Sequence, residues 1–195
     1  MTTHKNKFLP YYVFVFLCFV IASCQPVKLE NVVFDNNLLS KININAEKKI
    51  VNKVYEINYL DPYIDNTVNP TAIERLNNWL DENLIVFGTE NKLIINILEA
   101  SLTKIERNVE NKKLFNEKTE FYYEMKFKVE YILYDDNDFI LSTTEANTKR
   151  STTSSKYLSL YEKEKVANEL ILESLEDISL KSFEMLKLHM AKFLL

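Results

Sequence analysis

The clearest pattern in the chain is an alternation of apolar and polar residues between positions 120 and 134. Every odd position from Phe121 to Leu133 is apolar, whereas most even positions, beginning with Glu120, are charged. Successive side chains of a β-strand point to opposite faces of the sheet. The alternation therefore predicts a strand with one buried face and one solvent-facing face.

Three further segments predict strands. The segment 41–57 is rich in Ile and Val with partial alternation, and 139–152 follows an Asp/Asn-rich run, Asp135–Asp138, that is typical of a hairpin turn. The segment 93–105 is apolar on both sides at its centre, which favours a central strand. The polar stretch 107–119 is expected to be a long connection.

Two segments show helical spacing instead. Asn69-Pro70 is a helix-start signal, with Asn as the cap and Pro at the first helical position, and predicts a helix over 70–84. Its apolar residues fall three and four positions apart: Ile73, Leu76, Trp79, Leu80 and Leu84. The segment 157–195 predicts one long helix whose apolar side carries Ala167, Ile171, Leu175, Ile178, Met185, Leu186 and Phe193.

The resulting order is β-α-β-β-β-α. It predicts an α+β fold in which two helices pack on one face of a mostly antiparallel four-stranded sheet. We assign this single domain to residues 40–195 and a tether to residues 24–39, which contain Pro26 and no steady periodicity.

The N-terminus has the layout of a secretory signal. Lys5 and Lys7 precede an uncharged stretch, 9–23. That stretch is shorter than the roughly 20 apolar residues that span a bilayer as a helix, so a permanent transmembrane anchor is the weaker alternative. We expect residues 1–23 to be removed.

The stretch ends in Ile21-Ala22-Ser23-Cys24, which resembles a bacterial lipobox, with Ile in place of the commoner Leu. The resemblance implies that Ile21, Ala22 and Ser23 are read by the signal peptidase. It also implies that Cys24 receives diacylglycerol and a fatty acyl group such as palmitate. Two or three acyl chains hold a protein on a membrane, which a single chain does not. Gln25 stands where an Asp would resemble an inner-membrane retention signal, so we expect the periplasmic side of a Gram-negative outer membrane rather than the inner membrane.

Composition narrows the possible functions. Removal of Lys5 and Lys7 leaves 22 basic side chains against 28 acidic ones, a formal net charge of −6, which argues against nucleic-acid binding. Gly88 is the only glycine, so glycine-rich phosphate-binding loops are excluded. Cys18 is discarded and Cys24 is modified, which leaves no thiol for a disulfide or a metal site.

Reactive residues are scarce. His189 lies close to Leu186 on the last predicted helix, and the sequence offers it neither a Ser or Cys nucleophile nor a second metal ligand four residues away. We therefore expect a packed or partly buried histidine that takes no part in catalysis or metal binding. Turn formation and a solvated helix face explain the acidic pairs Asp135-Asp136 and Glu176-Asp177.

Two surface features remain open. Lys149-Arg150, with Lys163 and Lys165, fits either anionic lipid headgroups or ordinary surface charge. On the wet face of the alternating strand, Tyr122, Ile132 and Tyr134 add apolar area and suggest an interaction surface.

The anchor, tether and element order together resemble small envelope lipoproteins that serve multiprotein machines. These include the auxiliary lipoproteins of ABC-type lipid transporters and the lipoprotein that plugs the lipopolysaccharide-assembly barrel. The order is also similar to a group of alphaproteobacterial lipoproteins with a Pro-led first helix. The resemblance implies a non-enzymatic docking subunit, held on the membrane by its acyl chains and bound to a protein partner, with no cofactor beyond the lipid on Cys24. The alternative is a periplasmic carrier that holds a lipid between the long helix and the sheet, because 17 Tyr and Phe residues follow Cys24.

Overall fold

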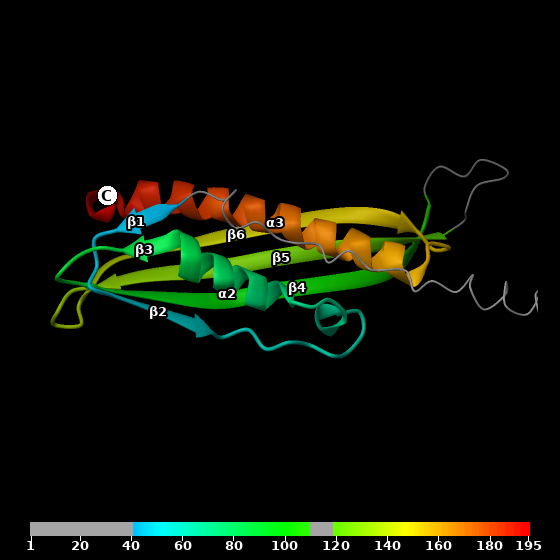
Figure 1. Ribbon diagram of the computed structural model, residues 1–195, viewed down its shortest axis with the longest axis horizontal. Coiled ribbons are helices and arrows are strands. Elements are labelled where there is room, and N and C mark those ends of the chain that lie inside the picture. Colours follow the sequence, from blue (N-terminus) through cyan, green and yellow to red (C-terminus); the bar gives the residue numbers. More distant parts are fainter. Residues whose placement is uncertain (1–40, 110–118) are drawn as a thin grey trace, which may run out of the picture. The chain divides into compact units, whose positions relative to one another are not determined.

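The computed structural model describes residues 41–109 and 119–195. All of them belong to one unit, Val33–Leu195. Its main sheet has the strand order β2-β4-β5-β6, in which β2 runs parallel to β4 and the other neighbours are antiparallel (Figure 1). The strands are β2 (Lys48–Lys53), β4 (Lys92–Asn108), β5 (Thr119–Tyr134) and β6 (Ile140–Ser155). The predicted α+β fold, with two helices and a mostly antiparallel four-stranded sheet, is confirmed.

The first predicted strand, 41–57, is wrong as a single element. It divides into β1 (Ile42–Ile44) and β2, and β1 pairs in parallel with a short strand, β3 (Leu84–Val86), to form a separate small sheet. Ala46 lies between the two strands, fully buried, where the chain passes from the small sheet to the main one. Ile44 also forms an antiparallel bridge with Leu194, so the C-terminal residues extend the small sheet.

Helix α2 (Ala72–Asn83) begins later than the sequence predicts. Thr71, not Asn69, is its N-cap: its hydroxyl accepts a hydrogen bond from the backbone N–H of Glu74, whose carboxylate accepts one in return from the backbone N–H of Thr71. The predicted apolar face is confirmed for the buried residues Ile73, Leu76, Trp79 and Leu80, whereas Leu84 starts β3. A short 3-10 turn, η2 (Asp65–Thr67), precedes the helix.

The alternation in β5 is confirmed. Its odd positions from Tyr123 to Leu133 are buried and its even positions are partly exposed. β4 lies between β2 and β5, the central place that its apolar pattern predicts. The turn 135–138 is a hairpin turn as expected, because Asp135 accepts hydrogen bonds from the backbone of Asn137 and Phe139, and Asp138 has a φ of 63°.

Strand and helix ends differ from the predictions by a few residues. β4 continues to Asn108 and β5 starts at Thr119, so both ends of the predicted connection 107–119 belong to strands. Helix α3 (Leu160–His189) is shorter than predicted because Ser159 caps it at one end and the chain turns into a 3-10 helix, η3 (Ala191–Phe193), at the other. Met185 and Phe193 on its predicted apolar side are only partly buried.

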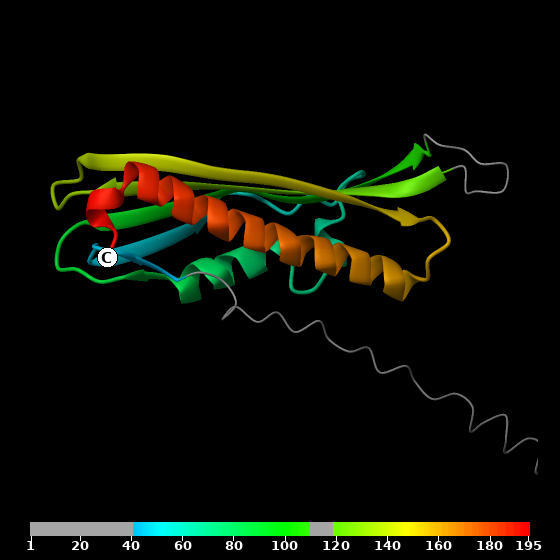
Figure 2. The same cartoon turned by 90° about the horizontal axis from the view of Figure 1, so that it is seen from above.

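Both helices cover the same face of the main sheet, α2 over β2 and β4, and α3 over β5 and β6 (Figure 2). The core fills this interface, where Tyr131, Leu175 and Ile178 are fully buried. Arg150 of β6 ties the layers together at their margin, with hydrogen bonds to Asp177 at 2.7 and 2.9 Å and to Glu173 at 3.0 Å. The opposite face of the sheet has no described element over it.

Candidate interaction surface

The sheet face that points away from the helices, called here the outer sheet face, is charged at its centre. Glu124 pairs with Lys149 at 2.8 Å, and Lys128 pairs with Glu145 at 3.0 Å. Burial alone raises the pKa of Glu124, but hydrogen bonds from Lys149, Lys126 and Tyr122 outweigh it and hold the pKa below its usual value. These charges are therefore matched within the sheet.

One end of the outer sheet face is apolar instead. Strand register sets Ile50 beside Ile94, and Ile94 beside Ile132, so three isoleucines form a row across three strands. The next row carries Tyr134 beside Ile140. We call these residues the apolar patch: Ile50, Ile94, Ile132, Tyr134 and Ile140.

The apolar patch is accessible. Ile50 and Ile140 are 42% and 59% exposed, and the other three members are partly exposed. At its border the ammonium of Lys92 lies 5.3 Å from the ring centre of Tyr134 and 2.6 Å from the carboxylate of Asp138. A contiguous apolar patch with a charged border is typical of a protein–protein contact.

The structure brings together two of the three residues that the sequence singles out. Ile132 and Tyr134 are in the apolar patch, whereas Tyr122 lies ten positions away from Ile132 on the same strand, or about 33 Å at the rise of an extended strand. There the guanidinium of Arg107 lies 4.5 Å from the centre of the Tyr122 ring. Tyr122 thus belongs to the correct face but to a different part of it.

Sequence reasoning missed Ile50, Ile94 and Ile140. They lie in three separate strands and become neighbours only through the pairing register, which a single-sequence pattern does not specify. Each of the three is an apolar residue on the solvent-facing side of its strand, and this position is the signal by which the sequence could have indicated them.

Three of the four cations that the sequence singles out near the end of β6 are already paired, and the ammonium of the fourth, Lys163, lies 5.3 Å from the centre of the Phe121 ring. Hydrogen bonding to Glu124 raises the pKa of Lys149, and hydrogen bonding to Asp177 raises the pKa of Arg150. Lys165 lies 3.7 Å from Glu169. Ordinary surface pairing therefore accounts for these three cations, and the structure gives them no special place for lipid headgroups.

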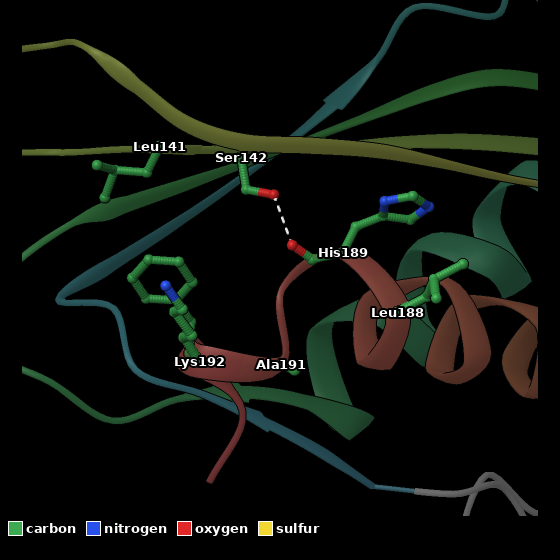
Figure 3. Close-up of a pocket in the computed structure, with 7 residues that line it drawn as sticks. Leu141, Ser142, Leu188, His189, Ala191 and Lys192 are labelled. Atoms are coloured by element: carbon green, nitrogen blue, oxygen red, sulfur yellow. Dashed lines mark hydrogen bonds between the residues drawn. The ribbon is translucent and has the colours of Figure 1, made fainter.

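The expectation that His189 is packed or partly buried is wrong: its side chain is exposed. It ends α3, and its backbone carbonyl accepts a 2.9 Å hydrogen bond from the hydroxyl of Ser142. Figure 3 shows Ser142 and its neighbour Leu141 across an opening from Lys192. This pocket, of about 340 Å³, is lined by Leu141, Ser142, Leu188, His189, Ala191, Lys192 and Phe193.

The expected lipidation site and its recognition residues, Cys24 with Ile21, Ala22 and Ser23, lie outside the described residues. Among residues 41–109 and 119–195, no helix is long and apolar enough to cross a membrane. The same part of the chain contains no group of three or more His, Cys, Asp or Glu side chains placed to hold a metal ion.

Two bacterial lipoproteins are among the solved structures that are similar to this chain. A minor lipoprotein from Acinetobacter baumannii is 10% identical and aligns with a TM-score of 0.37 over 70% of this chain and 87% of its own. The rare lipoprotein B from Shewanella oneidensis is 14% identical, with a TM-score of 0.37 over 71% of this chain and 94% of its own. No family model matches the sequence. No curated protein matches it either.

Proposed function

We propose that this protein is a non-enzymatic, lipid-anchored docking subunit of the bacterial envelope and that its apolar patch binds a protein partner. The observation that carries the docking role is the row of Ile50, Ile94 and Ile132, an apolar surface left exposed on a folded and otherwise charge-matched sheet face. The lipobox pattern at Cys24 supports the anchor. In its most specific form, the proposal places the protein at the outer membrane and gives it a role in lipid or lipopolysaccharide transport.

The carrier alternative meets an obstacle between α3 and the sheet. Tyr131, Leu175 and Ile178 fill that interface with their own side chains. A carrier would have to open this layer, whereas docking on the apolar patch needs no change in the core. The docking role therefore requires less conformational change than the carrier role.

The test is a mild-detergent pull-down of tagged full-length protein from its own membranes, with proteins and lipids identified together. Ile132→Glu places a charge in the centre of the apolar patch and is expected to reduce recovery of the partner at least tenfold, a loss of about 1.4 kcal/mol or more in binding. Tyr122→Glu is the matched control, because it makes a similar change on the same strand and face outside the patch.

Equal recovery of the partner with both variants would contradict the assignment of the apolar patch. Recovery of one lipid class and no protein would favour the carrier instead. The intact mass of the membrane-extracted protein tests the anchor separately, because an acylated Cys24 adds the mass of its lipid and Cys24→Ala removes it.

A further inference from the structure

A second apolar surface lies in the helix layer, on the other side of the main sheet from the apolar patch. In the small sheet, Ile42, Ile44 and Leu84 are buried against the core. Because side chains alternate along a strand, the residues between them turn outward. Phe87 follows β3 and is 57% exposed, and Leu195 is 68% exposed.

This outward face continues into the pocket at the end of α3. Phe193 contributes to both, because it lies beside the bridged residue Leu194 and lines the pocket. Leu141 and Leu188 also line the pocket and are 43% and 69% exposed. We call the combined region the terminal surface: Phe87, Leu141, Leu188, Lys192, Phe193 and Leu195.

The charged side chain among the residues of the terminal surface is a lysine. Lys192 is exposed and lines the pocket beside His189, and none of the seven pocket residues is acidic. Among the described residues, the ammonium of Lys192 has no ion pair. An apolar area with exposed lysine at its margin fits the boundary between lipid headgroups and acyl chains.

The chain also enters the domain at this place. The backbone N–H of Leu195 donates to the carbonyl of Asn43 at 3.1 Å, two residues after Lys41, where the described part begins. Sixteen residues separate Cys24 from Lys41. A chain of that length reaches at most about 55 Å when extended, and about 20–25 Å on average if flexible.

A lipid on Cys24 therefore keeps the point of entry, and the terminal surface beside it, close to the bilayer. We infer that the terminal surface rests on the membrane that holds the anchor, with Phe87, Leu188 and Leu195 in contact with lipid and Lys192 at the headgroups. This inference rests on the proposed lipid anchor. It leaves the apolar patch on the opposite side of the sheet free for a protein partner.

The test measures which face of the lipidated full-length protein meets lipid. In the proposed lipidated form Cys18 is removed with the signal and the thiol of Cys24 carries diacylglycerol, so an introduced cysteine is the only free thiol. An environment-sensitive fluorophore is attached to Leu188→Cys, or to Asn147→Cys as the control, an exposed position on β6 of the outer sheet face. The protein is reconstituted in vesicles of phosphatidylethanolamine and phosphatidylglycerol that carry a nitroxide quencher on the acyl chains.

The expected result is quenching several-fold stronger at position 188 than at position 147, with a blue shift only at 188. Equal, weak quenching at both positions on vesicle-bound protein would overturn the inference. So would a photo-crosslinker at position 188 that forms adducts with a protein rather than lipid in native membranes.

The experiment distinguishes failure of the proposed lipid anchor from failure of the proposed lipid contact at the terminal surface. If intact mass shows no acyl group on Cys24, the proposed function fails first. The surface is then tested on a chain whose signal is replaced by an N-terminal histidine tag bound to nickel-chelating lipid, with Cys24→Ala so that the introduced cysteine stays the only thiol. Strong quenching at position 188 on those vesicles supports the terminal surface, and its absence overturns it.

Discussion

Tyr131 is a fully buried residue of β5 whose hydroxyl donates a 2.7 Å hydrogen bond to the hydroxyl of Ser182 on α3. Burial raises the pKa of Tyr131, and the bond to Ser182 only partly offsets this, so its hydroxyl stays protonated and able to donate throughout the ordinary pH range. The bond joins the sheet to the long helix in the dry interior. Its loss leaves a buried oxygen without its partner.

Tyr131→Phe is expected to lower the free energy of unfolding by about 1–2 kcal/mol, because the Ser182 hydroxyl loses its buried partner. Ser182→Ala is expected to cost a similar amount. The double variant should cost less than the sum, because it leaves neither hydroxyl unpaired. Urea unfolding of the three variants checks the coupling, and strictly additive losses would contradict it.

The N-cap of α2 gives a prediction about pH. The backbone N–H and the hydroxyl of Thr71 donate to the Glu74 carboxylate at 2.8 and 2.9 Å, and these bonds hold the pKa of Glu74 below its usual 4.5. A carboxylate with a lowered pKa stabilises the fold above its unfolded-state pKa, and this contribution is lost as pH falls through the folded-state pKa.

Glu74→Gln is therefore expected to reduce stability by about 0.5 kcal/mol at neutral pH. The difference from the parent protein should shrink toward zero in acid, where the parent carboxylate is protonated as well. Unfolding midpoints measured over a pH series check this. A difference that grows as the pH falls would have the wrong sign.

At the scale of elements, β2 ends at Lys53, which pairs with Ile97 about a third of the way along β4. The segment 54–67 continues beside the exposed edge of β4. Backbone bonds from Ile64 to Leu102 and from Lys104 to Pro62, both 2.8 Å, attach it there. The buried carboxylate of Asp65 locks it in place. That carboxylate accepts hydrogen bonds from the Leu102 backbone at 2.6 Å and from the Tyr55 hydroxyl at 2.5 Å.

Asp65→Ala is expected to destabilise the domain by about 3 kcal/mol, because it leaves the buried N–H of Leu102 unpaired and frees the edge of β4. Asp61→Ala, an exposed change in the same segment, is the control and should have little effect. Hydrogen exchange at Leu102 provides the local measurement. Unchanged protection at Leu102 in the Asp65 variant would show that another contact holds the segment.

The accuracy of prediction differs among the elements for physical reasons. β5 and α2 were predictable because one face of each is buried. Apolar residues therefore recur every two residues in the strand and about every 3.6 residues in the helix. The segment 54–67 carries no such period, because one buried carboxylate and a few backbone bonds hold it. The small sheet was also missed, since its strands have three residues each and pair with partners far away in the chain.

At the scale of the whole described domain, the apolar patch and the terminal surface lie on opposite faces of the main sheet and meet at the start of β6, where Ile140 and Leu141 are consecutive. The sequence predicted Ile132 and Tyr134 as interaction residues, but their neighbours Ile50, Ile94 and Ile140 depend on register across four strands. A protein that rests on lipid with one side and binds a partner with the other needs this separation. The arrangement agrees with the docking role that we propose.

The most direct test of the docking role is site-specific photo-crosslinking in living cells, with the crosslinking residue placed at Ile132 or, as the control, at Tyr122 of the full-length protein. We predict one discrete protein adduct from position 132 and none of that mass from position 122. The same adduct from both positions, or none from position 132 in a protein that reaches the membrane, would contradict the assignment of the apolar patch as the partner-binding surface.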